Sequence, residues 1–435
     1  MKNQWKRLLL LILPCAGVTF LALWVFSESN TAVLWTDRPE FVLYVESFNA
    51  AQDDYKIEFH YMEVPAQGLS VLSGTAQETP DIVIGNWLKS ATTRTLFKPL
   101  DSFFTKNKID KAAFYPRLLN LGTIEEQQYL LPVAFNIPAL ALTRANAQLL
   151  SNSFTIGIDE IKTLSKAYNV EQNGVYSRMG FSPVWNDEFL YVTADMFNAA
   201  FREAETAPSV ASTLSGSVGD ITWNPEAIED VIKALRDWTQ EVNTSIQAED
   251  DFVFKYFYEP SAKLAMSGRV LFTYMNSASL FTLSQEQRSN LEFRWIAENN
   301  TIPVSEDTVY YGIYKRGKAK KAADAFTEWF FQAETQRRLL EISKEQRMNE
   351  TYFGISNGFS AIRTVTEQIF PLFYPSLLGH MPPSDFLSPP NILPQNWSIL
   401  KAQVIIPYLH ARIRQQDTRS LEWRISDWYR TNSSF

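Results

Sequence analysis

The chain has 435 residues, too many for one ordinary hydrophobic core, so its length predicts two lobes or three. Its formal net charge of −8 argues against nucleic acid as a partner, since contacts with phosphates require clustered Lys and Arg side chains. The hydrophobic fraction of 46% is typical of a globular protein, whereas the aromatic fraction of 14% is high. An aromatic excess fits either a bulky core or rings that line a cleft and stack on sugar rings.

The N-terminus has the features of a targeting segment, which we set at residues 1–30. Lys2, Lys6 and Arg7 precede an uncharged stretch, residues 8–26, that is about as long as a bilayer core requires. The flanking positive charge predicts a cytoplasmic N-terminus, so we expect the rest of the chain on the extracytoplasmic (periplasmic) side of a bacterial cytoplasmic membrane.

The only cysteine, Cys15, lies inside this segment, so the exported part has no disulfide. Residues 12–15 resemble a bacterial lipoprotein signal loosely, because Pro14 stands where a small residue normally precedes the cysteine. Three outcomes stay open: a lipid on Cys15, an uncleaved membrane helix, and cleavage after Ser29. The first two tether the protein to the membrane.

Strand and helix patterns alternate from residue 31 onward. Residues 32–36 form a short apolar run typical of a buried strand, residues 40–49 have helical spacing, and residues 55–61 alternate as a strand does. This order predicts a β-α-β unit. A further apolar run at residues 81–85 predicts a third strand.

Residues 128–144 contain two short apolar runs punctuated by Pro132, Asn136 and Pro138. Each run is long enough for a buried strand and too short for a helix. Proline cannot donate to a sheet ladder and lies at strand starts, edges or bends. The punctuation therefore predicts a chain that leaves one sheet and enters another, with Asn136 facing the space between two lobes.

Polar and aromatic residues follow the other predicted strands. In open α/β sheets, ligands lie beyond the carboxyl ends of the strands. These ends are followed by Asp37 and Arg38 and by Trp87, while Trp185 and Asn186 lie in a loop between a strand-like and a helical pattern. We expect these residues to line a ligand cleft.

The later segments predict helices and loops that serve mainly to pack the fold. Asn224 and Pro225 predict a helix start, and an apolar stripe that ends at Trp238 predicts its buried face. The basic run at residues 315–321 is interpreted as the solvated beginning of another helix. A Pro-rich loop at residues 382–394 precedes a final helical stretch.

Patterns that carry reaction chemistry are not found in the sequence. The histidines have no metal-ligand spacing, there is no second thiol, and no phosphate loop or nucleophile elbow occurs. We therefore expect no cofactor, no metal and no enzymatic activity. One alternative is that Asp37, Asp187 and Glu188 meet across a cleft as a glycosidase pair.

The order of segments resembles the solute-binding proteins of sugar-type ABC importers, the maltose-binding-protein-like family 1. The segments that carry this resemblance are LWTDRPEF at 34–41, TPDIVIGNWL at 79–88, LLPVAFNIPAL at 130–140, AKLAMSGRVLFTYMNS at 262–277 and a strand and helix at 307–341. The resemblance spans most of residues 31–360, and it rests on the order and spacing of motifs that are individually weak.

The resemblance implies a type II periplasmic-binding-protein-like fold, with two α/β lobes joined by a hinge and a ligand cleft between them. We expect residues 31–135 and 266–310 in one lobe, and residues 136–265 and 311–435 in a second, helix-rich lobe. A second crossing is expected near Tyr311 and Gly312.

The resemblance also implies a tethered, monomeric receptor that binds a sugar or oligosaccharide and delivers it to the permease subunits of an ABC importer. The candidate ligand-binding residues are Asp37, Arg38, Trp87, Asn136, Trp185, Asn186, Asn276 and Tyr311. The alternatives are a tethered glycan hydrolase that uses cleft carboxylates and a surface adhesin that reuses the fold.

Overall fold

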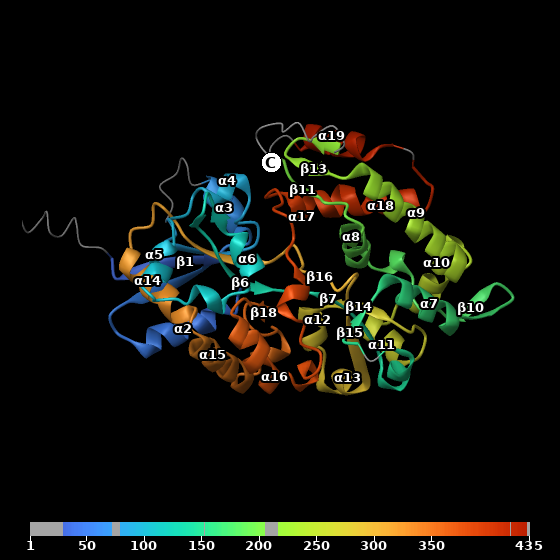
Figure 1. Cartoon of the computed structure of the whole chain (residues 1–435), viewed down its shortest axis with the longest axis horizontal. Helices are drawn as coiled ribbons and strands as arrows, with labels where there is room; N and C mark the ends of the chain where they lie inside the picture. The colour runs from blue at the N-terminus through green and yellow to red at the C-terminus, as the bar shows by residue number, and fades with distance from the viewer. Residues whose placement is uncertain (1–28, 72–78, 152, 205–215, 418, 433–435) are drawn as a thin grey trace, which may run out of the picture.

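The computed structural model describes residues 29–71, 79–151, 153–204, 216–417 and 419–432, which form two α/β lobes side by side (Figure 1). The predicted membrane segment and Cys15 lie outside these residues. In the part of the chain that is described, no helix is both long and apolar enough to cross a membrane.

The first lobe is built on a six-stranded sheet with the order β18-β6-β17-β3-β1-β2. The predicted β-α-β unit is confirmed, because β1 pairs in parallel with both β2 and β3, whereas β17 runs antiparallel between β3 and β6. The strands are β1 (Thr31–Thr36), β2 (Lys56–Tyr61), β3 (Ile82–Gly85), β6 (Leu131–Phe135), β17 (Val309–Ile313) and β18 (Phe359–Ser360).

Aromatic side chains fill the space between this sheet and its helices α2 (Phe41–Ala51), α14 (Lys320–Phe330) and α15 (Ala333–Glu345). The Phe41 and Phe330 ring centroids are 5.4 Å apart, and both side chains are buried. Much of the aromatic excess is therefore core packing, the first of the two explanations that the composition allowed.

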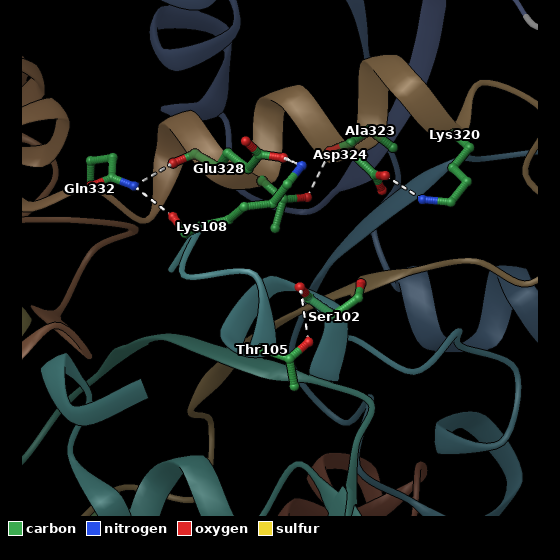
Figure 2. A network of polar contacts seen from close by, with 9 residues as sticks. Ser102, Thr105, Lys108, Lys320, Ala323, Asp324, Glu328 and Gln332 are labelled. Carbon is green, nitrogen blue, oxygen red and sulfur yellow. Dashed lines mark hydrogen bonds and ion pairs between the residues drawn. The ribbon is translucent and has the colours of Figure 1, made fainter. Parts of the chain in front are cut away.

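Hydrogen bonds at the surface connect α14 and the residues just after it to the loop that follows α5 (Asp101–Thr105), as Figure 2 shows. Lys108 donates a hydrogen bond to Glu328, and Gln332 Nε2 donates to the backbone oxygen of Lys108 at 3.0 Å. Lys320, from the basic run, forms an ion pair with Asp324 one turn along α14. The basic run therefore begins a helix, as predicted.

The second lobe is built on a four-stranded sheet with the order β14-β7-β15-β8 and a small sheet with the order β11-β13-β12. Its strands are β7 (Pro138–Thr143), β8 (Thr155–Ile156), β11 (Arg202–Glu203), β12 (Gly216–Val218), β13 (Ile221–Trp223), β14 (Thr273–Asn276) and β15 (Leu291–Ile296). Its longer helices are α7 (Ile158–Tyr168), α8 (Asp187–Met196), α9 (Pro225–Val242), α10 (Ile246–Tyr256), α18 (Ile406–Ile413) and α19 (Leu421–Thr431).

Helix α9 begins and packs as the sequence predicts. The Asn224 side chain accepts a hydrogen bond from Ala227 N at 3.3 Å, and Trp238 is buried. Beside α9, the fully buried carboxylate of Glu249 accepts hydrogen bonds from Asn243 Nδ2 at 2.7 Å and Thr239 Oγ1 at 3.3 Å. This polar network joins α9 to α10.

The C-terminal region returns to the second lobe and packs on α8 and α9 (Figure 1). The predicted final helical stretch comprises α17 (Trp397–Leu400), a π-helical segment (Lys401–Ile405) and α18. Trp397 is fully buried, and its ring lies against those of Tyr191 and Phe201.

Within the described ranges, the chain passes between the lobes three times. The first crossing is at Asn136, between β6 and β7, where the sequence predicts it. The second is at residues 304–308, between β16 (Ile302–Pro303) and β17, a few residues before the predicted position. The third lies between α16 (Phe370–Phe373) and β19 (Leu387–Ser388), since β19 pairs with β16.

The sheet pairings differ from the predicted lobe boundaries. β14, which lies within 266–310, pairs with β7 in the second lobe, and β17 pairs with β3 and β6 in the first. Gly312 is an interior position of β17, where a Cβ would come within 2.4 Å of the Phe97 ring, so its role is close packing rather than a hinge. Both strands are short and carry no local pattern that assigns them to one sheet, so only long-range pairing assigns them.

Candidate ligand site between the lobes

A cavity of about 410 Å³ lies between the lobes, within the range of about 300–1,000 Å³ that small-molecule sites occupy. Five parts of the chain contribute to it: the loop after β3, helix α8, strand β14, the second crossing, and the C-terminal helical stretch. The lining residues are Asn86, Trp87, Asp187, Glu188, Tyr274, Asn276, Ser305, Glu306, Asp307, Ser398, Lys401, Ala402 and Ile406.

Trp87 gives the first-lobe wall its aromatic surface. Its φ of 63° places it in the left-handed region, which is uncommon for a bulky residue and is often associated with function. Its ring packs against hydrophobic clusters of both lobes. The loop after β3 therefore holds this indole at the boundary between the lobes.

Asp37 and Arg38 stand behind this wall and do not belong to the lining. Arg38 Nη2 donates to Asn86 Oδ1 at 2.7 Å, and its Nε lies 3.3 Å from Asp37 Oδ1. Burial raises the pKa of Asp37, and the Arg38 charge opposes that rise. These two residues therefore position Asn86.

Helix α8 supplies the acidic part of the second-lobe wall. Asn186 caps the helix by accepting a hydrogen bond from Phe189 N at 3.0 Å, which leaves Asp187 and Glu188 in the first turn. Negative charge is favourable at a helix N-terminus because the backbone N–H groups there lack partners. His410 Nε2 lies 2.8 Å from Asp187 Oδ1.

The rest of the second-lobe wall comes from β14. Tyr274 and Asn276 belong to this strand, and their ring and amide face the same cavity as Trp87. Asn276 Oδ1 also accepts a hydrogen bond from Ser279 N at 2.8 Å, which caps the short helix α12 (Ser277–Phe281).

The two crossings are hydrogen-bonded to each other beside the cavity. Ser305 N donates to the backbone oxygen of Asn136 at 2.9 Å. The Asn136 side chain donates to Asn357 O at 3.0 Å and accepts from Ser277 Oγ at 2.6 Å. Asn136 thus ties the two lobes together at the hinge and is not among the lining residues.

Lys401 provides the positive charge among the described lining residues. Its Nζ donates to Glu188 Oε2 at 2.7 Å and also to Glu306, and it lies 4.3 Å from the centroid of the Tyr191 ring. Burial disfavours the charged form, but Glu306 and Glu188 together raise the pKa of Lys401 above its ordinary value. Lys401 is therefore an ammonium ion.

A second lysine lies in the first lobe close to the crossing. Lys89 is 4% exposed, its Nζ is 4.8 Å from the Tyr310 ring centroid, and no described residue accepts a hydrogen bond from it. Burial lowers the pKa of Lys89 to about 7, and the carboxylates of Asp307 and Glu306 oppose that change. Burial also raises the pKa of Asp307.

The structure places the predicted residues in three groups. Trp87 and Asn276 line the cavity. Asp37, Arg38 and Asn136 support its walls from behind. Trp185, Asn186 and Tyr311 lie outside the lining.

Trp185 and Asn186 lie beside a separate cavity of about 50 Å³ in the second lobe. The Trp185 ring stacks on Phe252 at a centroid distance of 5.5 Å. Tyr311 lies in the core of the first lobe, fully buried and hydrogen-bonded to Thr327 at 2.6 Å, because β17 is an inner strand covered on both faces. The expectation that Tyr311 contacts ligand therefore does not match its position.

Sequence reasoning missed the second crossing and the C-terminal helix as parts of the wall. The polar run of Ser305, Glu306 and Asp307 between two apolar strands was a usable local signal. Lys401 gave no local signal, because a single lysine in an amphipathic helix is normally expected to point into solvent. Within the described ranges, no group of three or more His, Cys, Asp or Glu side chains is placed to hold a metal ion.

Of the three carboxylates proposed as a glycosidase pair, Asp187 and Glu188 line the cavity and Asp37 does not. Glu188 is ion-paired with Lys401 at 2.7 Å, and Asp37 lies outside the lining. Burial raises the pKa of Glu188, and Lys401 opposes that rise.

Several solved structures of similar fold are sugar-binding proteins. A sugar transporter protein from Rhizobium etli in an open conformation has a TM-score of 0.63 and 12% identity, over 91% of this chain and 98% of that one. An ABC substrate-binding protein from Listeria monocytogenes in complex with cycloalternan has a TM-score of 0.62 and 11% identity, over 94% and 100%. A cyclo/maltodextrin-binding protein complexed with maltotetraose has a TM-score of 0.60 and 15% identity, over 94% of this chain and 97% of that one.

These likenesses establish the two-lobed fold. No protein of curated function is significantly similar to the chain in sequence. The family model described as bacterial extracellular solute-binding protein matches residues 44–345. The match covers most of both lobes, and the chain therefore belongs to the bacterial extracellular solute-binding protein family.

Proposed function

We propose that the protein is an extracytoplasmic receptor that binds a sugar or oligosaccharide between its lobes and delivers it to an ABC importer. The observation that carries the proposal is the cavity of about 410 Å³, in which Trp87 and Tyr274 accompany hydrogen-bonding groups from both lobes. Aromatic faces stack on the apolar faces of sugar rings, and the polar groups bind hydroxyls.

The relatives of similar fold support this ligand class, since two of them hold cycloalternan and maltotetraose. The family is extracellular, which supports an extracytoplasmic location. A solute that touches both walls stabilises the closed arrangement of the lobes, because only the closed state makes both sets of contacts. The permease subunits would then recognise the closed form.

The test is a thermal-shift screen of the purified chain from residue 29 against neutral mono- and oligosaccharides. A ligand at 100 times its dissociation constant stabilises a protein by about 2.7 kcal/mol, which gives a clear rise in melting temperature. Isothermal titration calorimetry then confirms a one-to-one complex. If no saccharide stabilises the protein, the proposed ligand class is wrong.

Tethering is part of the proposal, and its support is the uncharged stretch at residues 8–26 with Cys15. The full chain should fractionate with membranes. Loss of a radiolabelled fatty acid in Cys15→Ser would identify a lipid anchor, whereas membrane retention of the unlabelled variant would identify a helix anchor. Recovery of the wild type as a soluble cytoplasmic protein would contradict both.

A further inference from the structure

Lys401 lies outside the residues that the family model matches, 44–345, yet it lines the cavity. It begins the π-helical segment Lys401–Ile405, which interrupts the helical stretch between α17 and α18. Such π turns frequently occur at functional sites, because the extra residue redirects the side chains around it. The C-terminal region thus adds to the cavity a cation that lies outside the family-matched residues, together with Ser398, Ala402 and Ile406.

The ammonium group of Lys401 lies between two carboxylates from different parts of the fold. Glu188 is in the first turn of α8, and Glu306 is in the second crossing between the lobes. The side chains of Lys401 and Glu306 are only 10% and 11% exposed. Two of the three ammonium N–H groups are used, and an ammonium ion can donate but not accept.

Negative charge dominates the rest of the cavity wall. The carboxylates among the described lining residues are Asp187, Glu188, Glu306 and Asp307, and the one cation is Lys401. An acidic saccharide entering this cavity would meet like charges at close range, which is an effective way to reject a ligand. A primary amine on a saccharide, by contrast, has the same donor chemistry as the lysine that already lies between Glu188 and Glu306.

We propose that Lys401 is a specificity-determining residue, whose ammonium group occupies the place that an amine-bearing saccharide would need, so that Lys401 excludes amino saccharides while the wall carboxylates exclude acidic ones. The proposal rests on the proposed function and deepens it by naming the charge class of the ligand. Removing Lys401 while Glu188 and Glu306 remain would open a cation-binding position at the wall of the cavity.

The first test compares three matched disaccharides by calorimetry: a neutral one that the wild type binds, its amino-sugar analogue and its uronate analogue. The wild type should bind the neutral disaccharide at least tenfold more tightly than either analogue. In Lys401→Met, the affinity for the amino-sugar analogue relative to that for the neutral disaccharide should rise at least tenfold, while the affinity for the uronate analogue should stay weak. In Lys401→Arg, which keeps the charge, the wild-type order should persist.

The control is Lys162→Met, which removes the cation of an ion pair with Glu241 in the same lobe, where the two charges are 2.7 Å apart. It should leave the three affinities in the wild-type order. If Lys401→Met misfolds because it strands a buried carboxylate, the double variant Glu306→Gln with Lys401→Met takes its place, with Glu188 left as the acceptor for the amine. A ratio within threefold of the wild type in the variant that folds would overturn the proposal.

The second test does not require any saccharide. In Lys401→Ala, methylammonium chloride should raise the melting temperature relative to sodium chloride at equal ionic strength, because the small amine refills the position between the carboxylates. The wild type and Lys162→Ala should show no such difference. If no saccharide binds the wild type, the proposed function fails, and this measurement alone decides whether the position binds amines. No selective effect of methylammonium would then overturn the inference.

Discussion

Trp87 combines a strained backbone with a ring at the boundary of the lobes, and Trp185 combines an ordinary backbone with a partly buried ring that stacks against the second-lobe core. Substituting each indole in turn therefore distinguishes a contribution to ligand affinity from a contribution to stability. A ring that stacks on a ligand contributes to affinity, whereas a ring that fills a core contributes to the free energy of unfolding.

Trp87→Ala should weaken saccharide binding by about 1–3 kcal/mol, the range of a buried aromatic contact, with a small change in melting temperature. Trp185→Ala should instead lower the free energy of unfolding, by less than the roughly 3–5 kcal/mol of a fully buried aromatic because the ring is partly buried, and leave the affinity of the folded protein close to that of the wild type. Calorimetry and urea unfolding measure the two quantities. If Trp87→Ala lowered only the stability and Trp185→Ala lowered only the affinity, Trp185 and not Trp87 would contact the ligand.

Glu249 predicts a dependence of stability on pH. Burial raises the pKa of this carboxyl to about 7, although hydrogen bonds from Asn243 and Thr239 lower it in part. Since the pKa is higher in the folded than in the unfolded state, the stabilising effect of the proton is complete below pH 4.5 and is lost as the pH rises through 7. The shift corresponds to a change on the order of 3 kcal/mol.

Glu249→Gln should remove this dependence. Between pH 5 and pH 8, the melting temperature of the wild type should fall relative to that of the variant, because only the wild type must bury a charge at high pH. Differential scanning calorimetry at several pH values gives the comparison. Parallel curves for the two proteins would show that Glu249 titrates normally.

Among the elements, β11 and α4 (Ala91–Arg94) make a direct connection between the lobes. The Glu203 carboxylate of β11 accepts hydrogen bonds from Ala91 N at 2.8 and 3.1 Å, across from the second lobe to the first. Burial raises the pKa of Glu203, while the Ala91 N–H and the Arg94 charge lower it. Hydrogen bonds to an ionised group contribute about 1.5–3 kcal/mol, which is enough to bias a two-state closure.

Glu203→Ala should therefore open the ligand-free protein. We expect its radius of gyration in small-angle scattering to exceed that of the wild type, because one of the contacts between the lobes is lost. Glu241→Ala removes a carboxylate that pairs with Lys162 within the second lobe and should leave the profile unchanged. Superimposable profiles for Glu203→Ala and the wild type would show that this contact does not hold the lobes together.

The elements also show how far sequence patterns reach. The β-α-β unit, α9 and the crossing at Asn136 were predictable because each is encoded locally, by alternation, by a cap with an apolar stripe, or by proline punctuation. The lobe boundaries were not predictable, because β14 and β17 are short strands with no local pattern that shows which sheet they join. Likewise, Trp87 could be predicted as a cavity residue because it follows a strand end in the sequence. Lys401 could not, because it reaches the cavity only where the C-terminal region returns to the second lobe.

For the molecule as a whole, closure should depend on ligand. The wild type should become more compact when a saccharide binds, and Glu203→Ala should contract by more and reach the same radius of gyration, since contacts of the ligand with both lobes replace the lost hydrogen bonds. Small-angle scattering with and without the saccharide measures both. An unchanged wild-type profile with tight binding would mean a preclosed receptor.

The position of β17 between β3 and β6 has a consequence for the order in which the protein is made. A growing chain lacks the inner strand of its first lobe until Ile313 has left the ribosome, and its second lobe lacks the buried Trp397 until almost the end. Non-local pairings of this kind form late, because the chain between them must first be synthesised and then closed into a loop. Neither lobe can therefore complete its core until most of the chain has been synthesised, so the two lobes must finish folding late and almost together.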